Sequence, residues 1–226
     1  MTLVRHYKLN DNAASTTVVA TVGTNGTLAG GDNTSVKATT GPGGTITYAF
    51  DMNGTDDAVN IQEYDAADST AYSVSMWVNL DSVTNQYVMG RAASSYRWIR
   101  VTSSTVIRIS ASVDDADFTV PTLSTGTWYH IFATRTAANS GRLWINGTES
   151  VTGAISAGGN FTVNALARYS GAFTNGRIAE FRMWNSDESA NVATWYAEGV
   201  SAAGNKLHMP FVNRKVFQPI KRASVR

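Results

Sequence analysis

The sequence predicts an all-β protein: an antiparallel β-sandwich with jelly-roll-like connections, one short helix late in the chain and an extended C-terminal arm. Many short runs of β-branched and aromatic residues are separated by clusters of Gly, Asn and Asp, which favour turns. The cleanest run, residues 72–80 (YSVSMWVNL), alternates between two faces, as a half-buried strand does. Short strands at regular spacing with turn signals between them are typical of sandwiches.

Residues 127–147, TWYHIFATRTAANSGRLWING, give the strongest local signal for this fold. Their aromatic and β-branched residues predict two strands, at 128–133 and 142–145, joined by a short polar connection. Asn146-Gly147 supplies the positive φ angles that a tight turn needs. Apolar residues occupy both faces of the first strand, so we expect it at the centre of a sheet.

The remaining strands follow from the same signals in chain order. Residues 51–57 are expected to form an acidic loop between two of them, and residues 114–117 a second acidic loop. The expected strands lie at 3–9, 16–22, 45–50, 58–61, 72–80, 86–91, 96–102, 105–113, 118–123, 161–169, 177–184 and 206–211.

One segment breaks the β pattern. Ser186 is placed to cap a helix over residues 187–198, because acidic residues occupy the first turn, where the helix dipole favours them. Val192, Trp195 and Tyr196 are spaced for one apolar stripe. Gly199 follows at the position where helices commonly end.

The composition limits the kinds of protein that the chain can be. Hydrophobic residues make up 43% of the chain, which is enough for a real core. Charged residues make up only 15%, a weakly charged surface of the kind found on many extracellular and virion proteins. Cysteine is absent, which excludes disulfides, thiolate metal sites and cysteine nucleophiles. No signal-peptide pattern and no run of about 18 apolar residues is present, so we expect cytoplasmic synthesis and no membrane insertion.

The net charge of +1 hides an asymmetry along the chain. Six basic residues and no acidic ones follow Glu198, which leaves 12 basic against 17 acidic residues up to and including Glu198, a difference of −5. Residues 206–226 form either a solvated tail or an arm that docks on an acidic surface. With Pro210 and Pro219 in this segment, we divide the chain into a sandwich domain, residues 1–205, and a basic C-terminal arm, residues 206–226.

Several motifs carry a resemblance to a known family. They are YSVSMWV at 72–78, GTWYH at 126–130, RLWING at 142–147, GRIAEFRMWN at 176–185 and YAEG at 196–199. These motifs, in this order along the chain, resemble those of the laminin G-like, concanavalin A-like lectin/glucanase superfamily. This resemblance implies a concanavalin A-like sandwich, but the fold hosts lectins, hydrolases, adhesion modules and virion proteins alike.

Two further stretches look like laminin G-like domains of bacteriophage structural proteins: residues 7–14 (YKLNDNAA) and residues 53–57 (NGTDD). Members of the family often hold a calcium ion on a loop at the sandwich edge. The matching acidic ligand here would be Asp56 or Asp57, whereas Ala179 stands where the family often has Asp. An Asn-Gly turn whose side chains bond their own backbone is the alternative explanation of this loop.

The sequence gives no support for catalysis. Laminarinase-type members place two Glu in an ExDxE pattern so that both carboxylates face the scissile bond. No two of the five Glu residues here are four apart, so we expect no enzyme. His130 follows Trp128 on one strand face and is expected to be a core histidine.

Sugar binding has an aromatic candidate. Tyr96 and Trp98, with Trp77, could form a platform for sugar rings, although tryptophans in a sandwich are more often packing residues. Nucleic-acid binding is not expected, because the basic segment has no folded motif around it.

These observations lead to the hypothesis of a non-enzymatic bacteriophage structural protein in the virion, decorating the capsid or another surface, with capsid or tail subunits as partners and a homo-oligomeric state. The competing hypothesis is a glycan-binding lectin module that recognises host glycans and depends on calcium; no cofactor is required otherwise. The predicted interface residues are Arg214, Lys215, Val216, Phe217, Ile220, Lys221 and Arg222.

Overall fold

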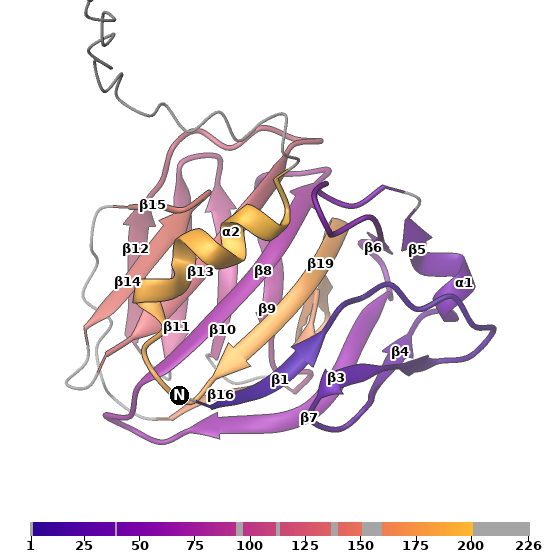
Figure 1. The fold of residues 1–226 in the computed structure, drawn as a ribbon, viewed down its shortest axis with the longest axis horizontal. Coiled ribbons are helices and arrows are strands. Elements are labelled where there is room, and N and C mark those ends of the chain that lie inside the picture. Colours follow the sequence, from indigo (N-terminus) through magenta and orange to yellow (C-terminus); the bar gives the residue numbers. More distant parts are fainter. Residues whose placement is uncertain are drawn as a thin grey trace, which may run out of the picture.

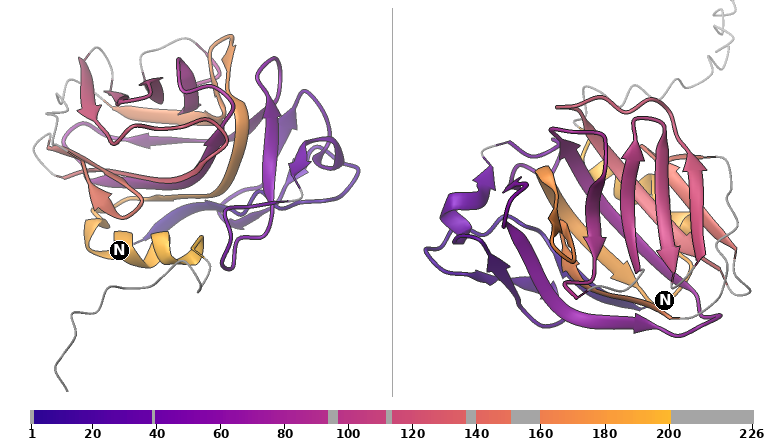
Figure 2. Two further views of the ribbon diagram at one scale, coloured as in Figure 1. Left: turned by 90° about the horizontal axis from the view of Figure 1, so that it is seen from above. Right: turned by 180° about the vertical axis from the view of Figure 1, so that it is seen from behind.

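The computed structural model describes residues 2–38, 40–93, 97–111, 114–136, 140–150 and 160–200. These residues form two antiparallel sheets packed face to face, which confirms the predicted all-β sandwich (Figures 1 and 2). Tyr96, the 206–211 strand, the arm and every predicted interface residue lie outside the described residues. None of the helices within these residues reaches the length and hydropathy of a membrane span.

The first sheet has nine strands within the described residues. Its order is β15 (Thr148–Glu149), β14 (Gly141–Ile145), β13 (Trp128–Arg135), β8 (Tyr72–Leu80), β19 (Asn175–Trp184), β1 (Leu3–Tyr7) and β3 (Ala20–Val22). Strand β6 (Ala49–Asn53) also pairs with β19, and β5 (Lys37–Ala38) pairs with β6.

The second sheet has eight strands within the same residues. Its order is β12 (Asp114–Thr119), β11 (Val106–Ala111), β10 (Arg97–Ser103), β9 (Gln86–Gly90), β16 (Phe161–Leu166), β7 (Ala58–Ala66), β4 (Gly26–Ala29) and β2 (Thr17–Val18). A separate hairpin joins β17 (Arg168–Tyr169) to β18 (Ala172–Phe173).

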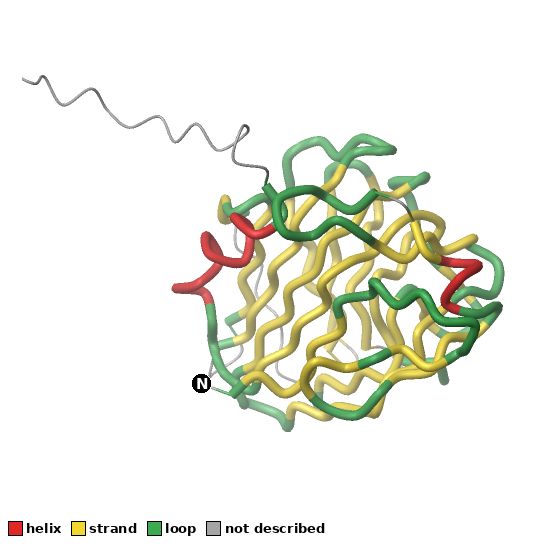
Figure 3. Tube along the Cα trace, turned by 45° about the vertical axis from the view of Figure 1, so that its right-hand side comes forward, coloured by secondary structure: helices red, strands yellow, loops and turns green. Residues whose placement is uncertain are grey.

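Helix α2 (Val192–Glu198) lies across the outer face of the first sheet, and α1 (Asn33–Val36) lies at the opposite end of the sandwich (Figures 1 and 3). Strand β8 has the predicted bounds and is buried along its whole length. Tyr72, Val74 and Met76 face the core between the sheets, whereas Trp77 faces the layer beneath α2. The helix is therefore the second layer that covers this sheet.

The predicted hairpin forms as β13 and β14, which pair with Ile131 opposite Ile145. Asn146 (φ 52) and Gly147 (φ 78) join β14 to β15 in a two-residue turn. Two successive positive φ angles match the twist of the flanking strands, as in type I′ turns.

Three sequence predictions need correction. Residues 16–22 are not one strand, because Thr17–Val18 pairs into the second sheet and Ala20–Val22 into the first. Strand β6 begins at Ala49 rather than at residue 45, so Asp51 belongs to a strand. Asp115 and Asp117 lie in β12 rather than in a loop, where both bind Arg108 of the neighbouring strand.

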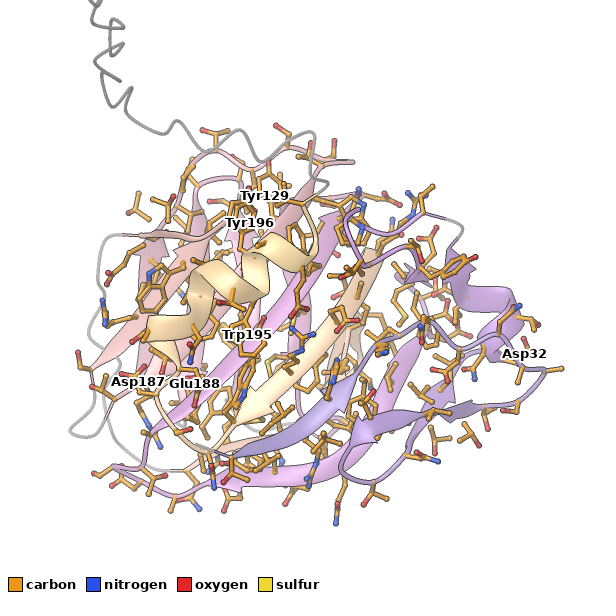
Figure 4. The ribbon with its side chains drawn as sticks, in the orientation of Figure 1. Asp32, Tyr129, Asp187, Glu188, Trp195 and Tyr196 are labelled. Carbon is orange, nitrogen blue, oxygen red and sulfur yellow. The ribbon has the colours of Figure 1, made fainter. Side chains whose placement is uncertain are left out.

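The helix is shorter than predicted and is not capped by Ser186. A 3₁₀ turn, η1 (Ser189–Asn191), precedes it, and α2 begins at Val192. The Ser186 hydroxyl donates to Glu188 Oε1 (2.7 Å), and Asp187 Oδ1 accepts from the Ser189 amide. The acidic side chains thus stabilise the turn between β19 and α2, where Figure 4 shows Asp187 and Glu188. The helix ends at Gly199 as predicted.

Candidate functional site

A β-bulge in β19 places charged side chains on the outer face of the first sheet. The register with β8 shifts between Ala179 and Arg182, and Glu180 takes a left-handed conformation (φ 50). Its amide donates to the carbonyl of Lys8. A non-glycine residue in this conformation costs about 1–3 kcal/mol, and such strain gathers at functional sites. Ile178 and Phe181 stay in the core, so the extra residue of the bulge is the one that turns outward.

The bulge brings four ionisable side chains together at this face. His6 Nε2 lies 2.7 Å from Glu180 Oε2, and Arg182 Nη2 donates to the same oxygen at 2.9 Å. The same nitrogen donates to Glu198 Oε2 at the end of α2 (2.6 Å). His6, Glu180 and Arg182 are between 7% and 8% exposed, so these polar side chains are held by one another rather than by water.

A pocket of about 210 Å³, here called the polar pocket, opens over this cluster. Its walls come from four places: the residues that follow β1, the segment before β6, strand β19, and α2. Tyr48 stands in its wall and is 40% exposed, one of only two strongly exposed large hydrophobic residues in the described part of the chain. The lining residues are Lys8, Asn10, Thr45, Ile46, Thr47, Tyr48, Glu180, Arg182 and Glu198.

A second pocket of about 210 Å³, here called the aromatic pocket, lies at the other side of the α2 end. Figure 4 shows Tyr196 on the last turn of the helix, and its ring stacks on Trp77 with centroids 5.7 Å apart. The pocket is lined by Pro42, Trp77, Trp128, Asn146, Tyr196, Gly199 and Val200.

His130 is a buried packing residue, as predicted. It is fully buried, its Nε2 lies 2.8 Å from Ser75 Oγ, and its ring packs against Trp77. Burial first, and the charge of Arg182 second, lower the pKa of His130 to about 3. A neutral imidazole at physiological pH fits a structural role.

Asp56 and Asp57 form the turn that was the alternative to a calcium site. Asn53 Oδ1 accepts from the backbone amides of residues 55, 56 and 57. The backbone amide of Asn53 donates to Asp57 Oδ2 (3.1 Å). Asn53 Nδ2 donates to Asp56 Oδ1 (2.7 Å). Each carboxylate thus already has a bond to Asn53, and no group of three His, Cys, Asp or Glu suited to a metal occurs among the described residues. A calcium ion takes six to eight oxygen ligands, and a calcium site at Asp56 and Asp57 stays a prediction.

Trp98 lies on the outer face of the second sheet, away from both pockets. Tyr87 and Tyr169 contact its ring edge to face, and the guanidinium of Arg100 lies over it, 4.9 Å from the centroid. Its exposure is 4%, so little of the ring is open to a sugar. Its predicted partner Tyr96 falls outside the described residues.

The charged cluster was missed from the sequence. His6 has no metal-ligand spacing to another residue, and no two glutamates stand four apart, so no sequence pattern links these side chains. The cluster depends instead on the pairing of β1 with β19, which sets His6 opposite Arg182. Two signals point toward it: Glu180 and Arg182 fall in the GRIAEFRMWN motif, and Glu198 falls in YAEG.

Two packed antiparallel sheets, with a polar pocket built on their outer face, define a lectin-like β-sandwich. The model of the concanavalin A-like lectin/glucanases superfamily matches residues 53–194, more than half of the chain. The chain belongs to this superfamily, which confirms the predicted resemblance. No curated protein sequence matches the chain.

Solved structures with a similar fold include binding domains of botulinum neurotoxins. They are the receptor binding domain of botulinum neurotoxin C/D mosaic serotype (TM-score 0.58, 16% identity), the botulinum neurotoxin serotype D ligand binding domain in complex with N-acetylneuraminic acid (0.60, 16%) and the botulinum neurotoxin DC binding domain in complex with rat synaptotagmin II (0.60, 13%). The matches cover 86%, 86% and 88% of this chain but 50%, 50% and 52% of those chains, so the chain spans about half of their length. At these identities the likeness shows the fold alone.

Proposed function

We propose that this chain is a non-enzymatic carbohydrate-binding module and that the polar pocket is its sugar site. The observation that carries the proposal is the buried guanidinium of Arg182, which holds the carboxylates of Glu180 and Glu198 side by side in the pocket wall. Binding sites are commonly concave and have a few fixed polar groups that orient the ligand. These charged groups are fixed before any ligand arrives, so little side-chain entropy is lost on binding.

The pocket offers both donors and acceptors. Within the described residues, no hydrogen bond uses Oε1 of Glu180 or Oε1 of Glu198, which leaves two acceptors for a ligand. Lys8 and Asn10 add donors at the other wall. Lys8 and Arg182 balance Glu180 and Glu198 in formal charge, so neither a simple anion nor a simple cation is favoured. A ligand rich in hydroxyl groups, which both donate and accept, fits this balance best.

Tyr48 adds a surface for the apolar face of a sugar ring. It is 40% exposed and stands among hydroxyl-bearing threonines at residues 45 and 47. An aromatic ring beside polar hydrogen-bonding groups suits a sugar, which has an apolar face and a polar edge.

The same geometry argues against glycoside hydrolysis. Hydrolysis needs one carboxylic acid that donates a proton and a second carboxylate that attacks or activates water. Glu180 and Glu198 instead both accept from one Arg182 nitrogen, and His6 also contacts Glu180. Neither is set up as a proton donor.

A glycan array followed by titration calorimetry tests this function. The wild-type protein should bind one class of glycan on the array, and Tyr48→Ala should weaken the binding of that glycan tenfold or more. Val19→Ala is the matched control, because Val19 is the other strongly exposed large hydrophobic residue in the described part of the chain. An array that stays silent both with calcium and with a chelator would refute the proposal, as would equal binding by wild type and Tyr48→Ala.

We also propose that the module is a surface component of a bacteriophage virion, anchored by residues 206–226. The similarity of residues 7–14 and 53–57 to phage laminin G-like domains supports this role. So does the separation of charge, with +6 after Glu198 and −5 up to and including it. Deleting residues 212–226 should abolish co-sedimentation with particles while the truncated protein still melts cooperatively. Undiminished particle binding by the truncated protein would refute the anchor.

A further inference from the structure

The polar and aromatic pockets are adjacent, and one contact between two segments of the chain separates them. The backbone amide and the hydroxyl of Thr45 both donate to the carbonyl of Glu198 (2.9 and 3.2 Å). Ile46 lines the polar pocket and also packs in one cluster with Trp77, Trp128, Tyr196 and Val200, which line the aromatic pocket. The two pockets therefore lie on opposite sides of a thin wall made by residues 41–48 and the end of α2.

The hairpin turn and α2 build the aromatic pocket together. At Gly147 a Cβ atom would lie 3.1 Å from Cδ1 of Tyr196, so the small residue lets the turn lie close to the ring. Asn146 Oδ1 accepts from the His130 amide (2.8 Å), which fixes the side-chain amide of Asn146 in the pocket wall. Two partly exposed rings, Trp128 and Tyr196, complete the walls.

One polar atom here has no partner. Trp77 is 4% exposed, and its Nε1 is buried without a hydrogen bond among the described residues. A buried indole N–H without an acceptor costs free energy. Because this atom is buried, a ligand in the aromatic pocket does not reach it. Since no side chain in the pocket lining carries a charge, the pocket suits a neutral group with an apolar face.

We propose that the aromatic pocket is a second sugar subsite and that the protein binds an oligosaccharide lying across the Thr45–Glu198 contact. This proposal rests on the sugar-binding function of the polar pocket. The sugar unit in the polar pocket uses its hydroxyls on Glu180, Arg182 and Glu198. A neutral pyranose further along the oligosaccharide lies against the rings of Trp128 and Tyr196. Joining two weak subsites through one ligand raises affinity by effective concentration, without any new contact to either unit.

Calorimetry with saccharides of increasing length tests the proposal. The probes are the monosaccharide terminus of the glycan found on the array and its longer oligomers, up to a tetrasaccharide. Wild-type affinity should rise at least tenfold from the monosaccharide to the longest oligomer. Trp128→Ala should abolish this rise and leave monosaccharide affinity unchanged, whereas Tyr48→Ala should weaken both.

Trp128→Phe is the matched control, because it keeps an aromatic ring and should retain most of the rise. It also keeps the test usable should Trp128→Ala fail to fold, which far-UV circular dichroism reports. Equal affinity for monosaccharide and oligomers in the wild type would overturn the second subsite while leaving the polar pocket intact. An unchanged rise of affinity with oligomer length in Trp128→Ala would also overturn the second subsite. Absence of any glycan binding by the wild type would instead refute the sugar-binding function itself.

Discussion

Gly199 lies directly against the indole ring of Trp77, so that a Cβ atom at this position would overlap Cε2 and Cζ2 of the ring. The φ angle of Gly199 is −92°, a value open to any residue, so glycine is required here for space and not for backbone conformation. The end of α2 can approach the sheet only because this residue has no side chain.

Gly199→Ala should therefore destabilise the fold by about 1–3 kcal/mol, the usual cost of overpacking a filled site. Gly171→Ala is a matched control, because nothing lies within 4 Å of a Cβ at Gly171. Urea denaturation of both variants measures the difference. Equal stability of the two variants would mean that α2 can shift away from Trp77 without loss.

Arg182→Ala should cost about 3–5 kcal/mol, because it leaves two carboxylates in the pocket wall without their cation. Arg142→Ala is the control: Arg142 also binds a glutamate, Glu149, but both side chains are about a third exposed, so its loss should cost about 1 kcal/mol or less. Thermal and urea unfolding compare the two. If the free energy of unfolding falls by the same small amount in both variants, the charged cluster does not hold β19 to α2.

His130 should make the protein sensitive to acid. Its folded pKa is lowered to about 3 by burial, against 6.5 in the unfolded chain, so between these pH values the unfolded chain binds a proton that the folded protein does not. Stability from this group is fully present above pH 6.5 and is lost as pH falls toward 3, at up to about 1.4 kcal/mol per pH unit.

His130→Gln, which can still bond to Ser75, should flatten this dependence. Urea midpoints at pH 7, 5.5 and 4.5 for wild type and variant measure it. Parallel pH curves for the two proteins would show that another group is responsible.

Asp57→Asn should leave the melting temperature at pH 7 unchanged or raise it. Burial, together with the charges of Asp56 and Asp51, raises the pKa of Asp57, while the Asn53 amide opposes this. A carboxyl with a raised folded pKa loses stability as pH rises through that range, so replacing it by a neutral amide removes a cost at pH 7. Calcium chloride should shift neither protein in differential scanning fluorimetry. A rise for the wild type that Asp57→Asn abolishes would restore a calcium site here.

Strands and turns were predicted most accurately from the sequence where one local signal dominates. Residues 72–80 and the hairpin around Asn146-Gly147 were placed correctly, since alternation and turn chemistry are local properties. The helix start was misplaced because Ser186 and Asp187 bond within the preceding turn instead of capping a helix. Residues 16–22 look like one β-branched strand, and only the packing of two sheets reveals that the chain passes from one to the other.

The candidate site could not be read from the sequence for a related reason. Glu180 faces the pocket through a bulge, which has no sequence pattern of its own, and its partner His6 is 174 positions away. The loop at Asp57 was open to two interpretations, because the sequence Asn-Gly-Thr-Asp-Asp can form a turn or can supply oxygen ligands to an ion. The backbone bonds of Asn53 show that the turn forms, whereas the ion stays a prediction.

The pairing of β1 with β19 also bears on how the protein is made. Residues 3–7 are translated long before their partner, residues 181–184. The first sheet cannot close during most of synthesis, and β19 must later insert between β8 and β1. Such long-range pairing slows folding and leaves open strand edges exposed to other nascent chains. A ribosome stalled before residue 175 would therefore release a half-sandwich prone to aggregate, so yield on expression should depend on translation speed and on chaperones more than on the stability of the finished protein.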